Sequence, residues 1–188
     1  MIKYEDLYIK VKEKLSEKRF KHSESVVKRA VEYALVYNID IETVKLTAIA
    51  HDIAKELSQE EEEECIRKYN IELDEIEKQN HNLLHAKIGA AICKYEYNFT
   101  DDMVNAIKYH TTGREEMTIL EKIIYLADAT EETRTYCPVV YANIIKENID
   151  NGMVEVTKWV INHLLENNNV IHLDSIKCYN YYCTQMSQ

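Results

Sequence analysis

The stretch Leu46-Thr-Ala-Ile-Ala-His-Asp-Ile-Ala54 places a charged doublet, His51-Asp52, inside an otherwise apolar run. The surrounding residues predict a helix that is buried nearly all round. Burying an ionised carboxylate without a partner costs far more free energy than packing returns. The partner of Asp52 is therefore either an Arg or Lys from another helix, or a metal ion that takes both His51 and Asp52 as ligands.

The composition predicts an all-α protein. The chain has 188 residues, enough for one domain with a proper core, and only three Gly and one Pro. So few helix breakers, with abundant Glu, Lys, Ala, Ile and Leu, favour helices joined by short connections. We find no Gly-rich phosphate loop, no strand-like alternation of useful length and no repeat of fixed period. We therefore expect a single-domain helical bundle.

Cysteine content and charge exclude several classes of protein. The five Cys are an odd number without Cys-x-x-Cys spacing, which argues against a disulfide framework or a zinc knuckle. The net charge of −10 argues against nonspecific binding to nucleic acid or to an anionic membrane. A phosphorylated small molecule remains compatible, because divalent ions in a pocket reverse the local sign of the charge.

The sequence also predicts where the protein resides and how it is organised. The first residues lack the apolar core of a signal peptide, and no segment approaches the roughly 18 apolar residues of a membrane span, so we expect a cytoplasmic protein. Residues 1–150 are expected to form the core, beginning with a helix within 1–16. Residues 151–188 are expected to add helices that pack on this core within the same domain.

Apolar periodicity and N-cap residues define the expected helices. The helix that carries the doublet should open at Asp40 and end near Lys55. The other helices are expected at about 4–15, from Ser16 through 34, from Ser58 onward, at 83–93, from Thr100 to His110, from Thr118 through Asp128, at 140–148, at 152–166, and from Ile171 onward. Residues 70–80 should form a polar connection.

A second carboxylate, Asp128, lies in the apolar run Ile123-Ile-Tyr-Leu-Ala-Asp128 and repeats the problem posed by Asp52. Three further His residues, His22, His85 and His110, lie on the inner faces or ends of their helices. Taken alone, a His on an apolar face is more often a packed core residue than a ligand. Lys and Arg are sparse on the apolar faces, however, so the combined pattern favours a metal.

Imidazoles and carboxylates together suit a divalent transition metal, and these side chains outnumber the ligands of one tetrahedral zinc. We therefore expect two divalent ions, with iron as the first choice, manganese, cobalt or zinc as alternatives, and Asp52 between them. His81, four residues before His85, should lie at the rim of its helix. The expected ligands are His22, His51, Asp52, His85, His110 and Asp128.

The order His…His-Asp…His…His…Asp resembles the HD-domain phosphohydrolase superfamily. Three longer strings, followed by Tyr125-Leu-Ala-Asp128, resemble its YqeK-like branch, bacterial enzymes that hydrolyse diadenosine tetraphosphate symmetrically to two ADP. These strings are His51-Asp-Ile-Ala-Lys55, Leu83-Leu-His-Ala-Lys-Ile-Gly-Ala90 and Ala106-Ile-Lys-Tyr-His-Thr-Thr-Gly-Arg114. The match spans roughly residues 15–150. One departure is Glu132, which replaces the usual Pro in Glu131-Glu-Thr-Arg134.

The resemblance implies an HD-type bundle with a metal centre among its core helices. One ion would be held by His22, His51, Asp52 and Asp128, and the other by Asp52, His85 and His110. Asp52 and Lys55 would be catalytic, and a water between the ions would attack the second phosphorus as hydroxide. The implied phosphate-binding residues are Lys55, Arg114 and Arg134, with Arg19, Thr111 and Thr112 as weaker candidates.

Two alternatives remain at this stage. Another HD phosphohydrolase could act on a deoxynucleoside triphosphate, a cyclic nucleotide or a guanosine polyphosphate. A nucleotide-sensing module, from a different class, would keep the ligands but turn over poorly. The intact ligand set, with Lys55 and Arg114, favours an enzyme. The expected partner is a small-molecule nucleotide rather than nucleic acid or membrane, and the oligomeric state is open, a homodimer included.

Overall fold

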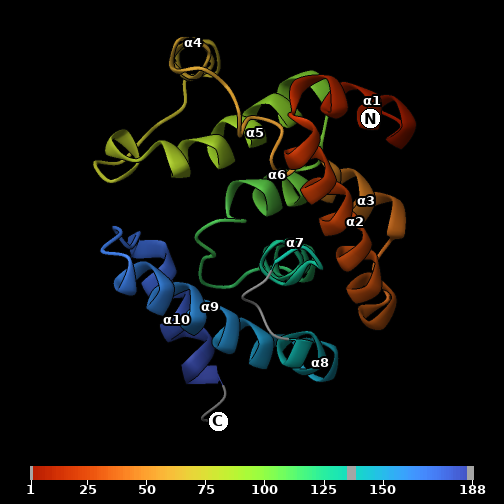
Figure 1. Ribbon diagram of the computed structural model, residues 1–188, viewed down its shortest axis with the longest axis vertical. Coiled ribbons are helices and arrows are strands. Elements are labelled where there is room, and N and C mark those ends of the chain that lie inside the picture. The colour runs from red at the N-terminus through yellow and green to blue at the C-terminus, as the bar shows by residue number, and fades with distance from the viewer. Residues whose placement is uncertain (1, 135–138, 186–188) are drawn as a thin grey trace.

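A computed structural model describes residues 2–134 and 139–185, except for the side chains of His81 and Val139 (Figure 1). Within these residues every regular element is a helix, as the composition predicts. The elements are α1 (Tyr4–Lys14), α2 (Glu17–Tyr37), α3 (Ile41–Ala50), α4 (Gln59–Tyr69), the 3-10 helix η1 (Glu77–Gln79), α5 (His81–Tyr97), α6 (Asp101–Lys108), α7 (Ile119–Thr130), α8 (Val139–Glu147), α9 (Ile149–Glu166) and α10 (Leu173–Gln185).

Side-chain caps fix where several helices begin. The hydroxyl of Ser16 accepts from the backbone N–H of Arg19 and starts α2. Ser58 and Glu61 form a reciprocal capping box at the start of α4. Because Gly is scarce, Asn takes over its role at helix ends: Asn38, Asn70 and Asn98 adopt the left-handed conformation after α2, α4 and α5.

Helix α7 forms the centre of the bundle, and Figure 1 shows it nearly end-on in the middle of the molecule. Every residue from Leu120 to Ala127 is buried. The helix packs against α2, α3, α6, α8 and α9. An apolar helix surrounded by other helices buries its hydrophobic surface on all sides. It therefore holds Asp128, near its C-terminal end, beside α2 and the end of α3.

The doublet lies at the end of a helix and not within one, so the predicted continuation of this helix to Lys55 was wrong. Helix α3 stops at Ala50, and residues 51–56 form turns. The backbone N–H groups of Ile53 and Lys55 donate to carbonyls three residues earlier, Ala50 and Asp52. This tighter winding ends the α-helix at the doublet. The side chains of His51 and Asp52 meet in these turns, with Nε2 of His51 3.4 Å from Oδ2 of Asp52.

The end of α6 repeats this local structure. The helix ends at Lys108, two residues before the predicted end, and the N–H of His110 donates to the carbonyl of Ile107 in the following turn. Gly113 then adopts a φ of 66°, and a Cβ there would lie 2.6 Å from the Sγ of Cys178. The turn after His110 is therefore packed closely against α10.

Helices α8, α9 and α10 pack on the rest of the bundle. Helix α9 contacts α7 and α8, and α10 contacts α9. Gly152 allows the close approach of α8, because a Cβ at this position would lie 2.5 Å from a side-chain carbon of Ile145. The helices of residues 2–134 and 139–185 include none that combines the length and the apolar character needed to cross a membrane.

Candidate metal centre

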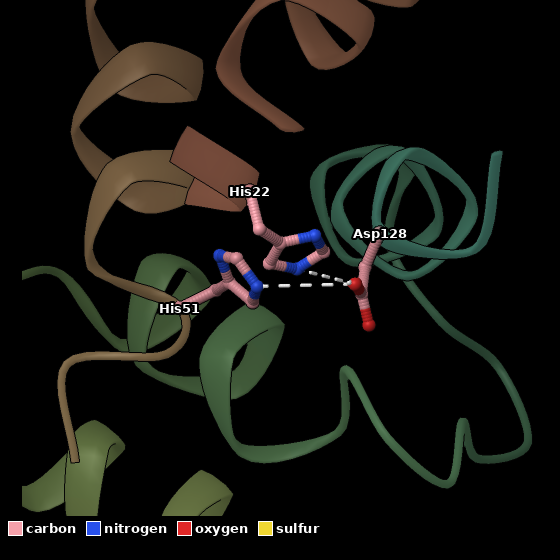
Figure 2. A group of neighbouring side chains, drawn as sticks. All are labelled: His22, His51 and Asp128. Carbon is pink, nitrogen blue, oxygen red and sulfur yellow. Dashed lines mark ion pairs between the residues drawn. The ribbon is translucent and has the colours of Figure 1, made fainter. Parts of the chain in front are cut away.

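The six side chains expected as ligands converge at one place in the bundle. They come from α2, the turn after α3, α5, the turn after α6, and α7. Figure 2 shows His22 and His51 directed toward Asp128. The Oδ1 atom of Asp128 lies 3.0 Å from Nε2 of His22 and 3.9 Å from Nε2 of His51. The side chains that the sequence singled out on separate helices are therefore neighbours.

The carboxylate of Asp52 lies between two pairs of His side chains. Its Oδ2 atom lies 3.4 Å from Nε2 of His51 and 3.7 Å from Nε2 of His22. Its Oδ1 atom lies 3.1 Å from Nε2 of His85 and 3.7 Å from Nε2 of His110. The side chain of Asp52 is only 4% exposed. Each carboxylate oxygen of this buried residue thus faces a different pair of His residues.

Three of the imidazoles have a fixed orientation. Nδ1 of His51 lies 2.7 Å from the carbonyl of Ala48, and Nδ1 of His110 lies 2.7 Å from the carbonyl of Ile107. Nδ1 of His22 lies 3.1 Å from Oε1 of Glu131. A carbonyl or carboxylate only accepts, so in each ring Nδ1 carries the hydrogen. When such a ring is neutral, it presents the lone pair of Nε2 to the cluster.

These residues fit a divalent metal. Nε2 of His22 and Nε2 of His51 are buried and make no hydrogen bond. The nitrogen and oxygen atoms of His22, His51 and Asp128 all lie within 4.8 Å of one another, as do those of His51, Asp52 and His110. Buried nitrogen donors without a hydrogen bond, grouped with carboxylate oxygens, are what an imidazole–carboxylate metal site requires.

His85 differs from the other three His residues. Its Nδ1 lies 3.3 Å from Nζ of Lys55, and its Nε2 lies 3.2 Å from Nε2 of His110. A protonated Lys55 only donates, so Nδ1 accepts and Nε2 carries the hydrogen toward Asp52. His85 can serve as a metal ligand through Nε2 only in the other tautomer.

The surroundings keep both carboxylates ionised. Burial alone would raise the pKa of Asp52, but the neighbouring His51, together with His110 and His85, holds that pKa well below its ordinary value. Burial would likewise raise the pKa of Asp128, and the neighbouring His22, whose Nε2 lies 3.0 Å from Oδ1 of Asp128, outweighs it. Burial lowers the pKa of His85 to about 4. The cluster therefore combines two anions with a neutral imidazole at neutral pH, which suits a cation.

Arginine side chains lie on the same cluster. NH1 of Arg19 donates to Oδ2 of Asp52 at 2.9 Å, and NH2 of Arg134 donates to Oδ1 of Asp128 at 2.6 Å. Both arginines line a cavity of about 420 Å³ that also reaches His22 and Lys18. A second cavity of about 290 Å³ is lined by Lys55. Asp52 therefore has a basic partner, Arg19, in addition to the neighbouring imidazoles.

Three residues expected to contact phosphate make their contacts elsewhere. NH2 of Arg114 pairs with Oε1 of Glu121 at 2.7 Å, and the guanidinium lies over the ring of Tyr109. The hydroxyl of Thr112 donates to the carbonyl of Gly113, and Thr111 lines a separate small cavity. Among the described residues, no contact joins Arg114, Thr111 or Thr112 to the cluster, because the turn after His110 packs toward α10.

Two further His residues are not among the six expected ligands. The side chain of His81 lies outside the described residues, so its place at the rim stays a prediction. Nε2 of His172 lies 2.7 Å from Oδ2 of Asp74. Together with Glu77 these side chains have the spacing of metal ligands. Glu77 is already held by Lys87 at 2.5 Å, and this group ties α10 to the connection before α5.

Glu131 received no role from the sequence although it contacts the cluster directly. Its side chain is fully buried, and it accepts from His22. One signal could have identified it: Glu131 follows Asp128 by three residues, so the two lie on the same face at the end of α7. The residue is therefore part of the surroundings that a metal at this site would have.

Comparison with known proteins defines the class. The family model of the HD domain matches residues 19–133, a range that contains all six converging side chains. The chain belongs to the HD-domain family. Its relatives include a symmetrical bis(5'-nucleosyl)-tetraphosphatase from Staphylococcus aureus, 35% identical over 91% of this chain and 90% of the relative. A symmetrical bis(5'-nucleosyl)-tetraphosphatase from Bacillus subtilis is 32% identical, over 91% of this chain and 92% of the relative.

A solved structure agrees with the fold. It is the crystal structure of a predicted HD superfamily hydrolase involved in NAD metabolism from Clostridium acetobutylicum. The two chains are 32% identical and superpose with a TM-score of 0.91 over 98% of this chain and 99% of the other. Because the agreement covers nearly all of the chain, α9 and α10 belong to the shared architecture. The HD-type bundle expected from the sequence motifs is confirmed.

Proposed function

We propose that this protein is a metal-dependent hydrolase that cleaves diadenosine tetraphosphate symmetrically to two ADP. The proposal is supported by relatives that bear this activity in their names and match about nine tenths of the chain. The observation that carries it is the arrangement about Asp52, whose two oxygens face separate pairs of His residues. Such an arrangement suits a carboxylate that bridges two ions.

The proposed ligand sets follow this division. His22, His51, Asp52 and Asp128 would hold one divalent ion, and Asp52, His85 and His110 would hold the other. Iron is the first choice, with manganese, cobalt or zinc as alternatives that accept the same ligands. When bound, such ions supply Lewis acidity toward phosphoryl oxygens and an activated water.

Positive side chains are available for the phosphates. Arg19, Arg134 and Lys18 line the cavity of about 420 Å³ next to His22, and planar guanidinium groups bind phosphate oxygens in pairs. Lys55, which contacts His85, lines the second cavity. We propose that the tetraphosphate extends from the arginines to Lys55, so that its central part would lie beside the ions that the cluster would hold. The phosphate contacts that the resemblance implies for Arg114, Thr111 and Thr112 stay predictions outside this proposal, because Arg114 pairs with Glu121 and Thr112 with the carbonyl of Gly113.

The reaction consumes one water and breaks one P–O bond at the second phosphorus, so each product is ADP. Positive groups lie on both sides of the cluster, which suits a substrate made of two equivalent halves. Asp52 and Asp128 would stay ionised through the reaction, because both have pKa values well below the ordinary range of an Asp. A small-molecule substrate agrees with the cavities, and cytoplasmic location remains a prediction.

Turnover of a nucleotide panel tests the proposal. Diadenosine tetraphosphate should give ADP as sole product, whereas ATP plus AMP would contradict symmetrical cleavage. Faster turnover of a deoxynucleoside triphosphate, a cyclic nucleotide or a guanosine polyphosphate would favour another HD phosphohydrolase. Binding without turnover of any substrate would favour the sensing module.

A further inference from the structure

Glu131 is a buried carboxylate in an unfavourable position. It immediately follows the last residue of α7, where the partial negative charge of the helix end disfavours an anion. Its side chain is fully buried. Packing alone would favour an apolar residue here, because a buried carboxylate is costly unless its oxygens are hydrogen-bonded. The contacts of this carboxylate therefore have to explain its presence.

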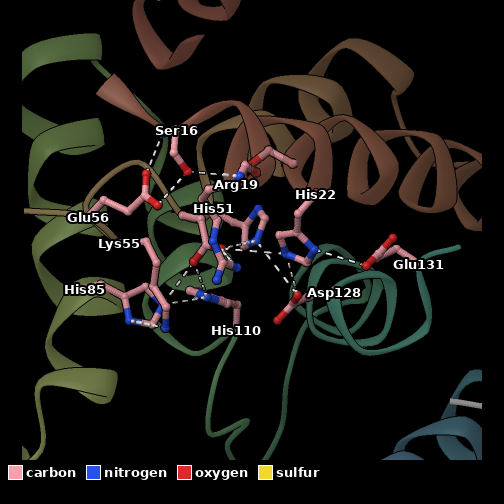
Figure 3. A network of polar contacts seen from close by, with 12 residues as sticks. Ser16, Arg19, His22, His51, Lys55, Glu56, His85, His110, Asp128 and Glu131 are labelled. Atoms are coloured by element: carbon pink, nitrogen blue, oxygen red, sulfur yellow. Dashed lines mark hydrogen bonds and ion pairs between the residues drawn. The ribbon is translucent and has the colours of Figure 1, made fainter. Parts of the chain in front are cut away.

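Those contacts are with His22, with Thr133 in the turn that follows α7, and with Arg134, whose Nε lies 3.7 Å from Oε1 of Glu131. Oε1 of Glu131 lies 3.1 Å from Nδ1 of His22 and accepts from the hydroxyl of Thr133 at 2.6 Å. Oε2 accepts from the backbone N–H of Thr133 at 2.6 Å. Figure 3 shows the ring of His22 between Asp128 and Glu131. Helix α7 and the residue that follows it thus contact both nitrogens of this ring, with Asp128 3.0 Å from Nε2.

The need for such a contact follows from where His22 lies. His51 and His110 come just after helix ends, and each finds its Nδ1 acceptor in a backbone carbonyl three residues earlier. His22 lies within α2, where the backbone carbonyls already accept from the helix itself. Its Nδ1 therefore needs an acceptor from another helix, and Glu131 supplies it.

We propose that Glu131 is a positioning residue for the metal centre, which accepts the Nδ1–H of His22 and directs the Nε2 lone pair toward Asp52 and Asp128. The inference rests on the metal site of the proposed function. It does not depend on which nucleotide is hydrolysed. Outer carboxylates that orient ligating imidazoles typically change metal affinity 10- to 100-fold when they are altered.

The test compares the affinity of the wild type and of Glu131→Gln for a metal ion. Co²⁺ or Zn²⁺ is added without nucleotide, and the affinity is measured by competition with a chelator. Glutamine keeps the size of the side chain but has one acceptor oxygen, for which His22 and the N–H of Thr133 compete. We expect affinity about 10- to 100-fold weaker than in the wild type. The matched control is Glu132→Gln, which alters an exposed ion pair with Lys28 and should leave affinity within about twofold of the wild type.

A second readout separates positioning from a structural role. In the Zn²⁺-loaded wild type, nitrogen-15 spectra should show His22 with hydrogen on Nδ1, and this signal should change in Glu131→Gln. Unchanged affinity together with an unchanged His22 signal would overturn the proposal. If the Gln variant melts too low for titration, Glu131→Asp keeps the charge and should show a smaller loss in the same direction, whereas wild-type affinity would overturn the proposal. A wild type without metal affinity would instead refute the proposed function.

Discussion

NH1 of Arg19 donates to Oδ2 of Asp52 at 2.9 Å. The side chain of Arg19 is 29% exposed, and that of Asp52 is 4% exposed. Arg19 also lines the cavity beside His22. It can therefore act as a charge partner of Asp52, as a phosphate contact, or as both. Imidazoles already surround Asp52, so the loss of Arg19 should affect substrate binding more than the metal centre.

We expect Arg19→Gln to raise KM for diadenosine tetraphosphate about tenfold, since a hydrogen bond to a charged group is worth about 1.5–3 kcal/mol. Metal content should stay at the wild-type level. Steady-state kinetics with elemental analysis measures both quantities. The control is Lys21→Gln, in an exposed ion pair with Glu17 on the same helix. Loss of metal with KM unchanged would show that Arg19 acts on the metal centre.

Asp52→Asn should remove metal and activity together. The amide keeps the size of the side chain but loses the charge on which both sets of imidazoles converge. We expect kcat/KM to fall by about 10³-fold or more, because a bound metal contributes several kcal/mol to the transition state. Elemental analysis of protein purified without chelators gives the metal count. A variant that retains two ions per chain would refute the bridging role of Asp52.

Metal uptake should release a proton. Burial alone would lower the pKa of His22, but its close contacts with the carboxylates of Asp128 and Glu131 raise that pKa to about 9 in the metal-free protein. Below this pH His22 is protonated, and a ligand must be neutral. Affinity should therefore increase as pH rises toward about 9. Calorimetry in buffers of different ionisation enthalpy measures the release, and a heat independent of the buffer would contradict it.

Arg114→Ala should lower stability more than substrate affinity. The substitution leaves the carboxylate of Glu121 buried without its partner, which costs about 1–3 kcal/mol. Thermal unfolding of the metal-free protein measures this loss, and KM should stay within about twofold of the wild type. The opposite pattern, with KM raised and stability unchanged, would support the phosphate role expected from the sequence motif.

The sequence predicts much of the fold and most of the converging cluster. Apolar periodicity places His22 and Asp128 on inner faces, and N-cap residues such as Ser16 and Thr118 mark helix starts. Periodicity cannot show that α3 stops at Ala50, because the tight turn depends on packing around His51 and Asp52. The direction of the turn after His110 depends on Cys178 in α10, far away in the chain.

The role of Glu131 shows the same limit. A Glu at the end of a helix is normally solvated, and its burial against His22 follows only from how α2 crosses α7. Sequence spacing identifies residues that share a face of one helix. It does not identify the partner that each residue meets on another helix.

The most direct test of the central claim is product analysis of diadenosine tetraphosphate hydrolysis by the metal-loaded protein. A metal centre at the cluster, with positive groups on both sides for the two halves of the substrate, predicts two ADP per substrate and no other nucleotide. Equal amounts of ATP and AMP would contradict this account.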